Sequence, residues 1–300
     1  MPKFHLSDPP RLSRSPLNRA EELRRDTAVL AAGWSTGRLL NVDGRGRFGV
    51  DEDGLILTPA VDVAPEPTAD AVFLGIHGDR HLWTRRVEIV EGTLGDLRTD
   101  GDRLDSTALS MVTGALAILN WHASAQFSSL DGAPSVPSNA GWSRTSTSTR
   151  HEEFPRTDPA VICLVHDGRD RVLLARAPAW PERRFSVLAG FVEAGESLET
   201  CVAREIKEEV GLDVSDIDYL GSQPWPFPRS VMIGFSAVAD PEQPLLFQDG
   251  EIAEAHWFDR AEVVAALELG DWGSESTSRL LLPGSISIAR GMLEAWAATV

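Results

Sequence analysis

The sequence predicts a mixed α/β (α+β) protein in which a mixed sheet lies between helices and a smaller mixed domain precedes it. Short runs of aliphatic and β-branched residues alternate with segments whose apolar residues recur at helical spacing. A stretch rich in Ser, Thr, Gly and Pro divides two such regions, and 300 residues suffice for about two domains. We therefore expect an N-terminal mixed α/β domain over residues 1–122, an irregular linker module over 123–157 and a larger α/β domain over 158–300.

The composition limits the function classes. Hydrophobic residues make up 42% of the chain and charged residues 24%, as in ordinary soluble globular proteins. The net charge of −17 argues against non-specific binding to nucleic acid or to an anionic membrane. No apolar run approaches the roughly 18 residues that a membrane helix needs, so no membrane association is expected.

Two further features concern the compartment and the start of the chain. Cys163 and Cys201 are expected to be buried apolar fillers rather than a disulfide or nucleophiles, which favours a cytoplasmic protein. Residues 1–25 carry arginines and acids without an apolar segment, so we expect a mobile arm and not a signal peptide.

The N-terminal domain has no catalytic motif of its own. Asn18 to Glu21 has the pattern of a capping box, which predicts a helix to about Ala32, and a second helix is expected over 106–121. The prolines at 65 and 67 place a loop over 61–70. Strands are expected over 38–42, 55–58, 71–76 and 81–87, the last two joined by a turn at 77–80.

The C-terminal domain has the pattern of strands interrupted by one long amphipathic helix. Strands are expected over 160–165, 171–176, 185–189, 217–221, 231–238 and 253–258. Helices are expected over 198–210, from a capping box at Asp259 to Glu262, and over 285–297.

The stretch from Gly190 to Leu212 carries the strongest chemical signal. On a helix over 198–210, ended by Gly211, the glutamates at 205, 208 and 209 share one face. Like charges so close oppose helix formation, which points to function, and hard divalent cations such as magnesium or manganese would relieve the repulsion. The alternative is a solvated acidic helix in an acidic protein. Leu198, Val202 and Ile206 are expected to bury the opposite face.

A second motif follows the next strand. The segment Ser222-Gln223-Pro224-Trp225-Pro226-Phe227-Pro228-Arg229-Ser230 contains three prolines that stiffen it, two aromatic rings and several hydrogen-bonding groups. Such a loop suits a nucleotide held by ring contact and polar groups. From the residues alone, a proline-rich connector that packs its aromatic rings into the core is an equal alternative.

The two motifs resemble one family. Gly190, Glu196, Arg204, Glu205, Glu208, Glu209 and Gly211 fall in register with the Nudix box, and Ile206 and Leu212 fill its aliphatic places. Together with the proline-rich loop, they resemble the NADH pyrophosphatase (NAD+ diphosphatase) branch of the Nudix hydrolases, whose loop usually has Gln where this chain has Arg229. The resemblance covers about residues 106–300, with the N-terminal domain only weakly included.

The resemblance implies a Nudix fold and a metal-dependent enzyme that cleaves the pyrophosphate of NADH or NAD+ into AMP and nicotinamide mononucleotide. It implies magnesium or manganese held by Glu205, Glu209, Glu251 and the carbonyl of Ala189, with Glu208 binding metal or accepting a proton from water and Arg204 orienting the glutamates. Substrate contacts are implied at Gln223, Pro224, Trp225, Pro226, Phe227, Pro228, Arg229, Ser230, Ala289, Phe191 and Phe154. Members are generally homodimers, so Phe154 is expected to come from the partner subunit.

The resemblance also marks a difference. The family usually carries a four-cysteine zinc ribbon in the middle region, and this chain has Ser128, Asp131, Ser146 and Thr149 at the matching positions. Because hydroxyls supply neither the charge nor the softness that zinc needs, we expect a degenerate, irregular ribbon without zinc.

Two other hypotheses about the function stay open. One is a related enzyme acting mainly on NAD-capped RNA or ADP-ribose, and the acidic net charge argues mildly against RNA. The other is a binding or sensor module that kept the fold without turnover, against which the intact set of glutamates argues.

Overall fold

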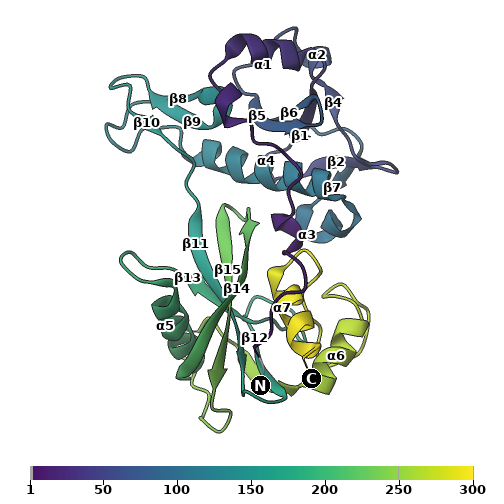
Figure 1. The fold of residues 1–300 in the computed structure, drawn as a ribbon, viewed down its shortest axis with the longest axis vertical. Coiled ribbons are helices and arrows are strands. Elements are labelled where there is room, and N and C mark those ends of the chain that lie inside the picture. The colour runs from purple at the N-terminus through teal and green to yellow at the C-terminus, as the bar shows by residue number, and fades with distance from the viewer. Residues whose placement is uncertain (1–2, 249, 300) are drawn as a thin grey trace. The chain divides into compact units, whose positions relative to one another are not determined.

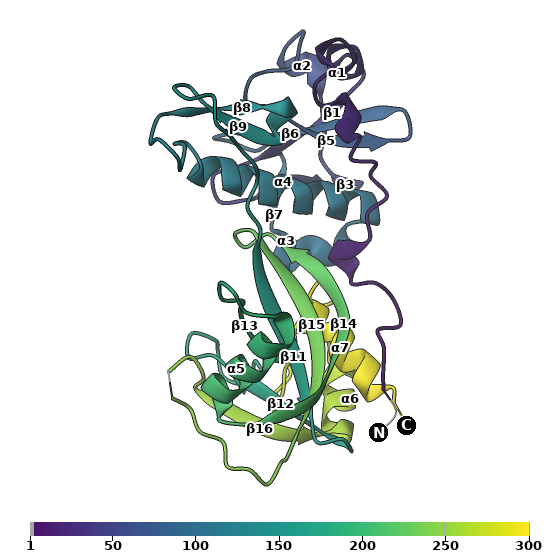
Figure 2. The same ribbon diagram turned by 60° about the vertical axis from the view of Figure 1, so that its left-hand side comes forward.

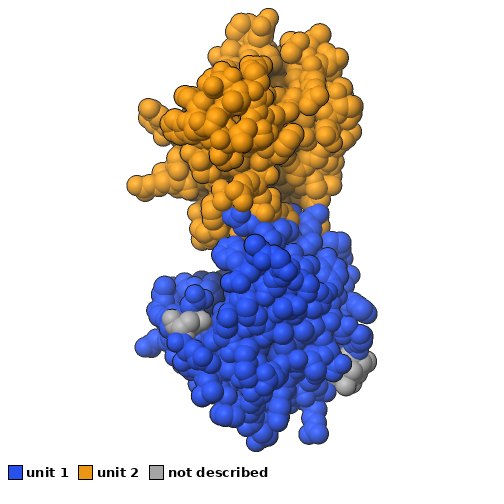
Figure 3. Space-filling view, turned by 90° about the vertical axis from the view of Figure 1, so that its left-hand side faces the viewer, with its two compact units in different colours: residues 1–13, 158–223, 231–300 blue, residues 14–157, 224–230 orange. Residues whose placement is uncertain are grey.

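The computed structural model describes residues 3–248 and 250–299, and they form two compact units (Figure 3). The C-terminal unit comprises residues 1–13, 158–223 and 231–300, and the N-terminal unit comprises 14–157 and 224–230. Residues 123–157 thus belong to the N-terminal unit. Residues 1–13 belong to the C-terminal unit, and residues 224–230 belong to the N-terminal unit. Within the described ranges, the helices are too short or too polar to cross a lipid bilayer.

A seven-stranded sheet forms the centre of the N-terminal unit. Its strands are β1 (Arg38–Val42), β2 (Phe48–Asp51), β3 (Gly54–Leu55), β4 (Thr58–Pro59), β5 (Val72–His77), β6 (Arg80–Arg86) and β7 (Thr93–Gly95). Their order is β3-β2-β1-β6-β5, with β4 paired to β1 and β7 to β2. The β1–β6 pair is parallel and the other pairs are antiparallel, so this sheet is mixed.

Helices cover both faces of this sheet (Figure 2). The helical segments are η1 (Arg11–Ser13, in the C-terminal unit), η2 (Glu21–Leu23), α1 (Thr27–Trp34), α2 (Ala60–Val63), α3 (Leu97–Asp100), η3 (Gly101–Arg103) and α4 (Ser106–Ser124). Trp34 of α1 packs edge to face on Trp83 of β6, with ring centres 5.0 Å apart. Since Leu82 and Trp83 are both buried, successive residues of β6 enter the cores on opposite faces.

Several local predictions for this unit were wrong. The first helix begins at Thr27, capped by Asp26, because the backbone of Asn18 is hydrogen-bonded to Ile76 of the sheet. The expected strand over 55–58 is split into β3 and β4. The expected loop over 61–70 begins with α2, and β2, β7 and α3 had no prediction. Two of these short strands pair with strands far away in the sequence, β4 with β1 and β7 with β2, and local sequence patterns do not report such pairing.

The middle region is more regular than its composition predicts. It forms a three-stranded antiparallel sheet of β8 (Ser135–Ser138), β9 (Ser143–Ser146) and β10 (Glu152–Glu153), with the short helix η4 (Asn139–Gly141) between the first two. Its hydroxyl groups are used inside the sheet: Ser138 bonds to Ser143 and Thr145, and Ser143 donates to Glu152. The expectation of an irregular segment was therefore wrong.

The four positions that match zinc-ribbon cysteines meet around one carboxylate. Ser146 Oγ donates to Asp131 Oδ2 at 2.8 Å, Thr149 donates to the same oxygen, and the Ala133 amide donates to Oδ1 at 3.0 Å. Hydrogen bonds, foremost that from Thr149 and including one from Ser128, hold the pKa of Asp131 well below its usual range. A carboxylate thus ties together two turns that a zinc ion would join in a metal-bearing ribbon.

The C-terminal unit is built around a six-stranded sheet. Its strands are β11 (Asp158–His166), β12 (Arg171–Arg176), β13 (Leu188–Phe191), β14 (Val214–Trp225), β15 (Ser230–Ala239) and β16 (Glu254–Asp259), and its helices are α5 (Leu198–Val210), α6 (Arg260–Glu268) and α7 (Ile288–Ala297). The order is β14-β15-β11-β12-β16, with β13 paired to β11. The predicted fold class is confirmed.

Figure 1 shows α5 on one face of this sheet and α6 and α7 on the other. Alternate residues of β11 divide accordingly: Ile162 and Leu164 enter the core under α7, whereas Val161 and Cys163 enter the core under α5. Burial on both faces explains why this strand is a continuous apolar run. Both cysteines are free and buried, as predicted.

The start of the chain is not a mobile arm over residues 3–13. Phe4 is 8% exposed and belongs to the same core as Ile162, and Ser13 Oγ donates to the Ser222 carbonyl at 2.6 Å. The prediction failed because two apolar side chains of this segment, Phe4 and Leu12, are buried and so fix the chain.

Candidate active site

The predicted helix over 198–210 is confirmed with the same bounds, as α5. Ser197 caps its first turn by accepting a hydrogen bond from the Thr200 amide, and Gly211 ends it in the left-handed conformation with φ of 79°. Val202 and Ile206 are buried as predicted, whereas Leu198 is only partly buried. Packing of this apolar face against the sheet fixes the helix, and with it the positions of the glutamates.

Arg204 is the centre of the site's charge network. Its guanidinium contacts Glu196 through two hydrogen bonds of 2.8 and 2.9 Å, and contacts Glu205 and Glu208 at 2.9 Å each. It also donates to the Phe191 carbonyl at 3.0 Å. The Arg204 guanidinium thus fixes Glu205 and Glu208, two of the predicted catalytic glutamates, and joins α5 to β13.

Glu196 is a site residue to which the sequence reasoning gave no role. Its two carboxylate oxygens hold Arg204 in a fork, and the Glu193 amide donates to Oε2 at 3.1 Å. The hydrogen bonds from Arg204 hold the pKa of Glu196 well below its usual range. The available signal was the position of Glu196 in the box, eight residues before the arginine.

Glu205 lies directly against the backbone of β13. A Cβ atom added to Gly190 would be 1.9 Å from its Cδ and about 2.1 Å from one of its oxygens. Burial raises the pKa of Glu205, and the charges of Glu208 and Glu251 act in the same direction while Arg204 opposes them. Gly190 is therefore required because it leaves the space that this carboxylate fills.

The remaining acidic residues differ in exposure. Glu209 is 5% exposed, the Glu208 side chain is 55% exposed, and Glu251 lies on the surface just before β16. In the part of the chain that the structure describes, no three His, Cys, Asp or Glu side chains form a set ready to bind a metal ion. The Glu205 and Glu208 carboxylates are turned toward Arg204.

The residues present nevertheless fit a hard divalent cation. The donors are carboxylate oxygens, the ligands that magnesium and manganese prefer. The space above Gly190 seats Glu205 against the strand that also carries the Ala189 carbonyl. A carboxylate as buried as Glu209 is stable as an anion only where cations or donors compensate its desolvation.

The proline-rich segment is a hairpin tip rather than a long loop. β14 continues to Trp225 and β15 begins at Ser230. Trp225 and Phe227 pack edge to face with ring centres 4.9 Å apart, and both rings are partly exposed. Rings that are half buried against each other still have surface for a ligand.

Gln223, an implied substrate contact, is buried in this structure. It is 1% exposed, its Nε2 donates to the Ile286 carbonyl at 3.2 Å, and among the described residues no donor lies within hydrogen-bond distance of its buried Oε1. Ala289 is also buried, in the first turn of α7, whereas Phe191 is 59% and Phe154 is 61% exposed. The two phenylalanines belong to different units.

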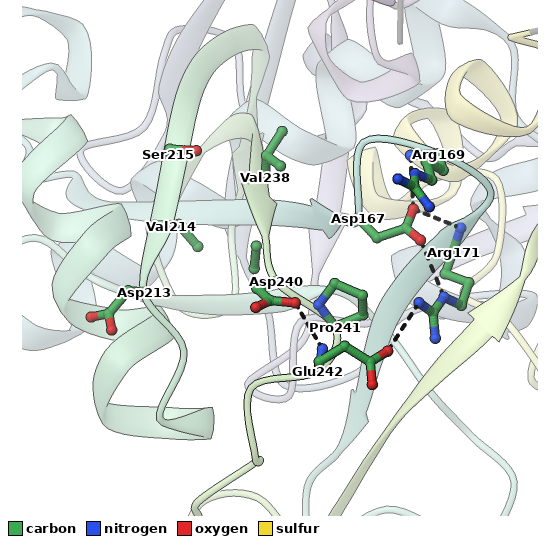
Figure 4. Close-up of a pocket in the computed structure, with 11 residues that line it drawn as sticks. Asp167, Arg169, Arg171, Asp213, Val214, Ser215, Val238, Asp240, Pro241 and Glu242 are labelled. Atoms are coloured by element: carbon green, nitrogen blue, oxygen red, sulfur yellow. Dashed lines mark hydrogen bonds and ion pairs between the residues drawn. The ribbon is translucent and has the colours of Figure 1, made fainter.

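A separate cleft of about 590 Å³ is lined by none of the predicted site residues. It lies between the β11–β12 turn and the neighbouring ends of β14 and β15 (Figure 4). Arg171 extends between Asp167, at 3.1 Å, and Glu242, at 3.6 Å. Arg171 is thus paired with two of the acidic residues that line the cleft.

The chain is similar in sequence to known proteins. A model of the NUDIX domain matches residues 156–280. The chain is 56% identical over 303 residues to the NAD-capped RNA hydrolase NudC of Mycobacterium bovis (strain BCG / Pasteur 1173P2), covering 98% of this chain and 97% of the relative, and has the same figures for NudC of Mycobacterium tuberculosis (strain ATCC 25618 / H37Rv). It is 40% identical over 214 residues to the mitochondrial NAD(P)H pyrophosphatase NUDT13 of Mus musculus, covering 69% of this chain and 60% of the relative.

Proposed function

The chain belongs to the Nudix hydrolase family, and from that membership we propose that it hydrolyses the pyrophosphate bond of NADH and NAD+. The products are AMP and reduced or oxidised nicotinamide mononucleotide. The observation that carries the proposal is the arginine-centred set of glutamates beside Gly190, in a chain that also has the proline-rich loop. The name of the NUDT13 relative supports the same reaction class.

We assign the metal to the oxygens of Glu205, Glu209, Glu251 and the Ala189 carbonyl. A divalent cation bound there supplies Lewis-acid polarisation of the phosphate oxygens and offsets charge that develops on phosphorus. We propose magnesium or manganese at this site, which the all-oxygen donor set supports. We also propose that the ribbon-like module of residues 123–157 binds no zinc, because its only carboxylate among the four matching positions, Asp131, already accepts hydrogen bonds from Ser146 and Thr149.

The side chains divide the remaining work. Arg204 keeps Glu205 and Glu208 at fixed positions, so that little reorganisation is needed when the substrate binds. Water attacks one phosphorus atom, and the P–O bond to the bridging oxygen breaks, so that the oxygen and its electron pair leave with the other phosphate. The proton released by water passes to Glu208, the more exposed of the two glutamates that contact Arg204 from α5. Phe191 offers an open ring face for a base, and Phe154 offers a second one across the proposed dimer. The tip from Pro224 to Ser230 contacts the rest of the substrate, whereas Gln223 and Ala289, each 1% exposed, support the site from the core.

The second candidate substrate is NAD-capped RNA, and one observation favours it. The NudC relatives, which match 98% of this chain, are named NAD-capped RNA hydrolases. Cleavage of the same pyrophosphate in a cap uses the same groups, since the RNA extends from the adenosine side. We also propose a homodimer in the cytoplasm; the two free, buried cysteines are compatible with a reducing compartment.

A substrate panel tests these proposals. Purified protein is incubated with NADH, NAD+, ADP-ribose and NAD-capped RNA, with magnesium or manganese, and the products are quantified. AMP from NADH or NAD+ is the expected result. If neither dinucleotide yields AMP at excess metal, the proposed function is wrong, and cleavage of capped RNA alone would make the second candidate the correct one.

A further inference from the structure

The proline-rich tip cannot stabilise its own backbone. Pro224, Pro226 and Pro228 have no amide hydrogen, so three of seven residues supply no donor. The hydrogen bond from the Phe227 amide to the Trp225 carbonyl, at 2.8 Å, spans only two residues. The carbonyls of this tip must therefore find donors elsewhere in the fold.

Asn120, near the end of α4, supplies two of these donors. Its side-chain Nδ2 donates to the Pro228 carbonyl at 2.9 Å and to the Pro226 carbonyl at 3.2 Å. Both carbonyls and Asn120 lie in the N-terminal unit, although the tip interrupts the sequence of the other unit.

The orientation of the Asn120 amide is itself fixed. Its Oδ1 accepts a hydrogen bond of 3.0 Å from Arg86 of β6, so the NH2 group must face the tip. Arg86 in turn donates to the Asp43 carbonyl. A continuous chain of hydrogen bonds thus runs from the N-terminal sheet through Asn120 to the tip.

Two side chains of the tip are held by the same unit. The Arg98 guanidinium lies over the Phe227 ring, 3.7 Å from its centre, and Arg229 donates to Ser124 Oγ at 3.3 Å. Because Phe227 packs on Trp225, fixing one ring also restricts the other. Arg229, at the position where the family's loop usually has Gln, thus contacts α4.

We propose that Asn120 is a positioning residue for substrate binding, and that the N-terminal unit serves to hold the tip from Pro224 to Ser230 in its binding conformation. Asn120 acts through the Pro226 and Pro228 carbonyls and touches no reacting atom. The inference rests on the proposed function, since it takes the tip as part of the site for the dinucleotide.

The test replaces Asn120 by Leu, which keeps the volume and removes both donors. We expect the KM for NADH to rise about tenfold, as for the loss of one to two net hydrogen bonds, while kcat changes less than threefold. Asn41→Leu is the matched control, because Asn41 bonds to Arg85 and Thr58 in the same sheet and does not contact the tip. Its KM should stay within twofold of wild type.

A double variant separates positioning from general destabilisation. If Asn120 acts through the tip, Asn120→Leu should have little further effect on KM in a Trp225→Ala background. Full additivity of the two changes, or an unchanged KM in Asn120→Leu, would overturn the inference. If Asn120→Leu does not fold, Asn120→Asp replaces it, since the carboxylate keeps the shape but cannot donate.

The inference can also fail or survive separately from the proposed function. NADH binding to each variant is followed by the fluorescence of NADH, without turnover. Wild-type protein that binds NADH with Asn120-dependent affinity but does not cleave it would refute the proposed function and support the positioning role. Cleavage of NADH by the wild-type protein, with unchanged affinity in both Asn120 variants, would support the proposed function and refute the positioning role.

Discussion

Gly190→Ala tests whether the space above β13 determines activity. The new methyl carbon would be 1.9 Å from Cδ of Glu205, whereas an ordinary contact begins at 3.4 Å, so the carboxylate must move by about 1.5 Å. Arg204 contacts this carboxylate at 2.9 Å and is itself held by Glu196, which limits a coordinated shift. Since a misplacement of about 1 Å can cost about 100-fold in rate, we expect kcat/KM to fall by about 100-fold or more.

The assay measures AMP released from NADH at several metal concentrations, with thermal unfolding of the same samples. Overpacking should cost about 1–3 kcal/mol of stability, so most of the protein stays folded. Gly44→Ala is the matched control, because its added carbon has no neighbour within 4 Å and its φ is ordinary. In the double variant Gly190→Ala, Glu205→Ala, stability should recover, because the clash is removed, while activity should not.

A folded Gly190→Ala protein with more than one third of the wild-type kcat/KM would show that the space above Gly190 does not limit activity. It would mean either that Glu205 can move without loss of function or that its observed position is not the active one. An unchanged defect in stability in the double variant would show that the methyl group clashes with something other than Glu205.

Four further predictions use other parts of the chain. Glu209→Gln should lower turnover by about 100-fold without unfolding the protein, measured as AMP release, and near-normal activity would return Glu209 to a structural role. Trp225→Ala should weaken NADH binding more than it slows cleavage of smaller substrates, and an equal loss on all substrates would make the tip a structural brace. Elemental analysis of dialysed protein should find well under one zinc per chain, and Asp131→Ala should lower the melting temperature, whereas retained zinc would contradict the hydrogen-bonded ribbon. Burial lowers the pKa of His122 from 6.5 to about 4. Neutral His122 therefore contributes on the order of 3 kcal/mol to the free energy of unfolding above pH 6.5, and this contribution is lost as the pH falls toward 4. His122→Gln should reduce the pH dependence of stability measured by urea unfolding, and the same pH dependence as wild type would exclude the assignment.

Elements whose causes are local could be predicted from the amino-acid sequence. α5 was predicted with its observed bounds because its cap, its apolar spacing and its terminal glycine all lie within the segment. The capping box at Asp259 formed for the same reason, and β12 has the predicted ends. Charge repulsion among neighbouring glutamates also needs no tertiary information, so their spacing marked one helix face as a candidate site. The other candidate residues came from the resemblance to the Nudix hydrolases.

Which partners these elements bind depends on the folded chain and could not be predicted. Asn18, a good helix cap by sequence, pairs with Ile76 instead, since a place in the sheet satisfies its backbone better. Ser128, Asp131, Ser146 and Thr149 look like an unstructured polar stretch until the fold brings two turns around one carboxylate. Gly190 must be glycine because Glu205, fifteen residues later, occupies the space of its side chain, and the tip of β14 and β15 depends on Asn120 more than 100 residues earlier. The contacts of Asn18 with Ile76 and of Asn120 with the tip leave no periodic or local pattern in the sequence, because they depend on where the packed chain places each group.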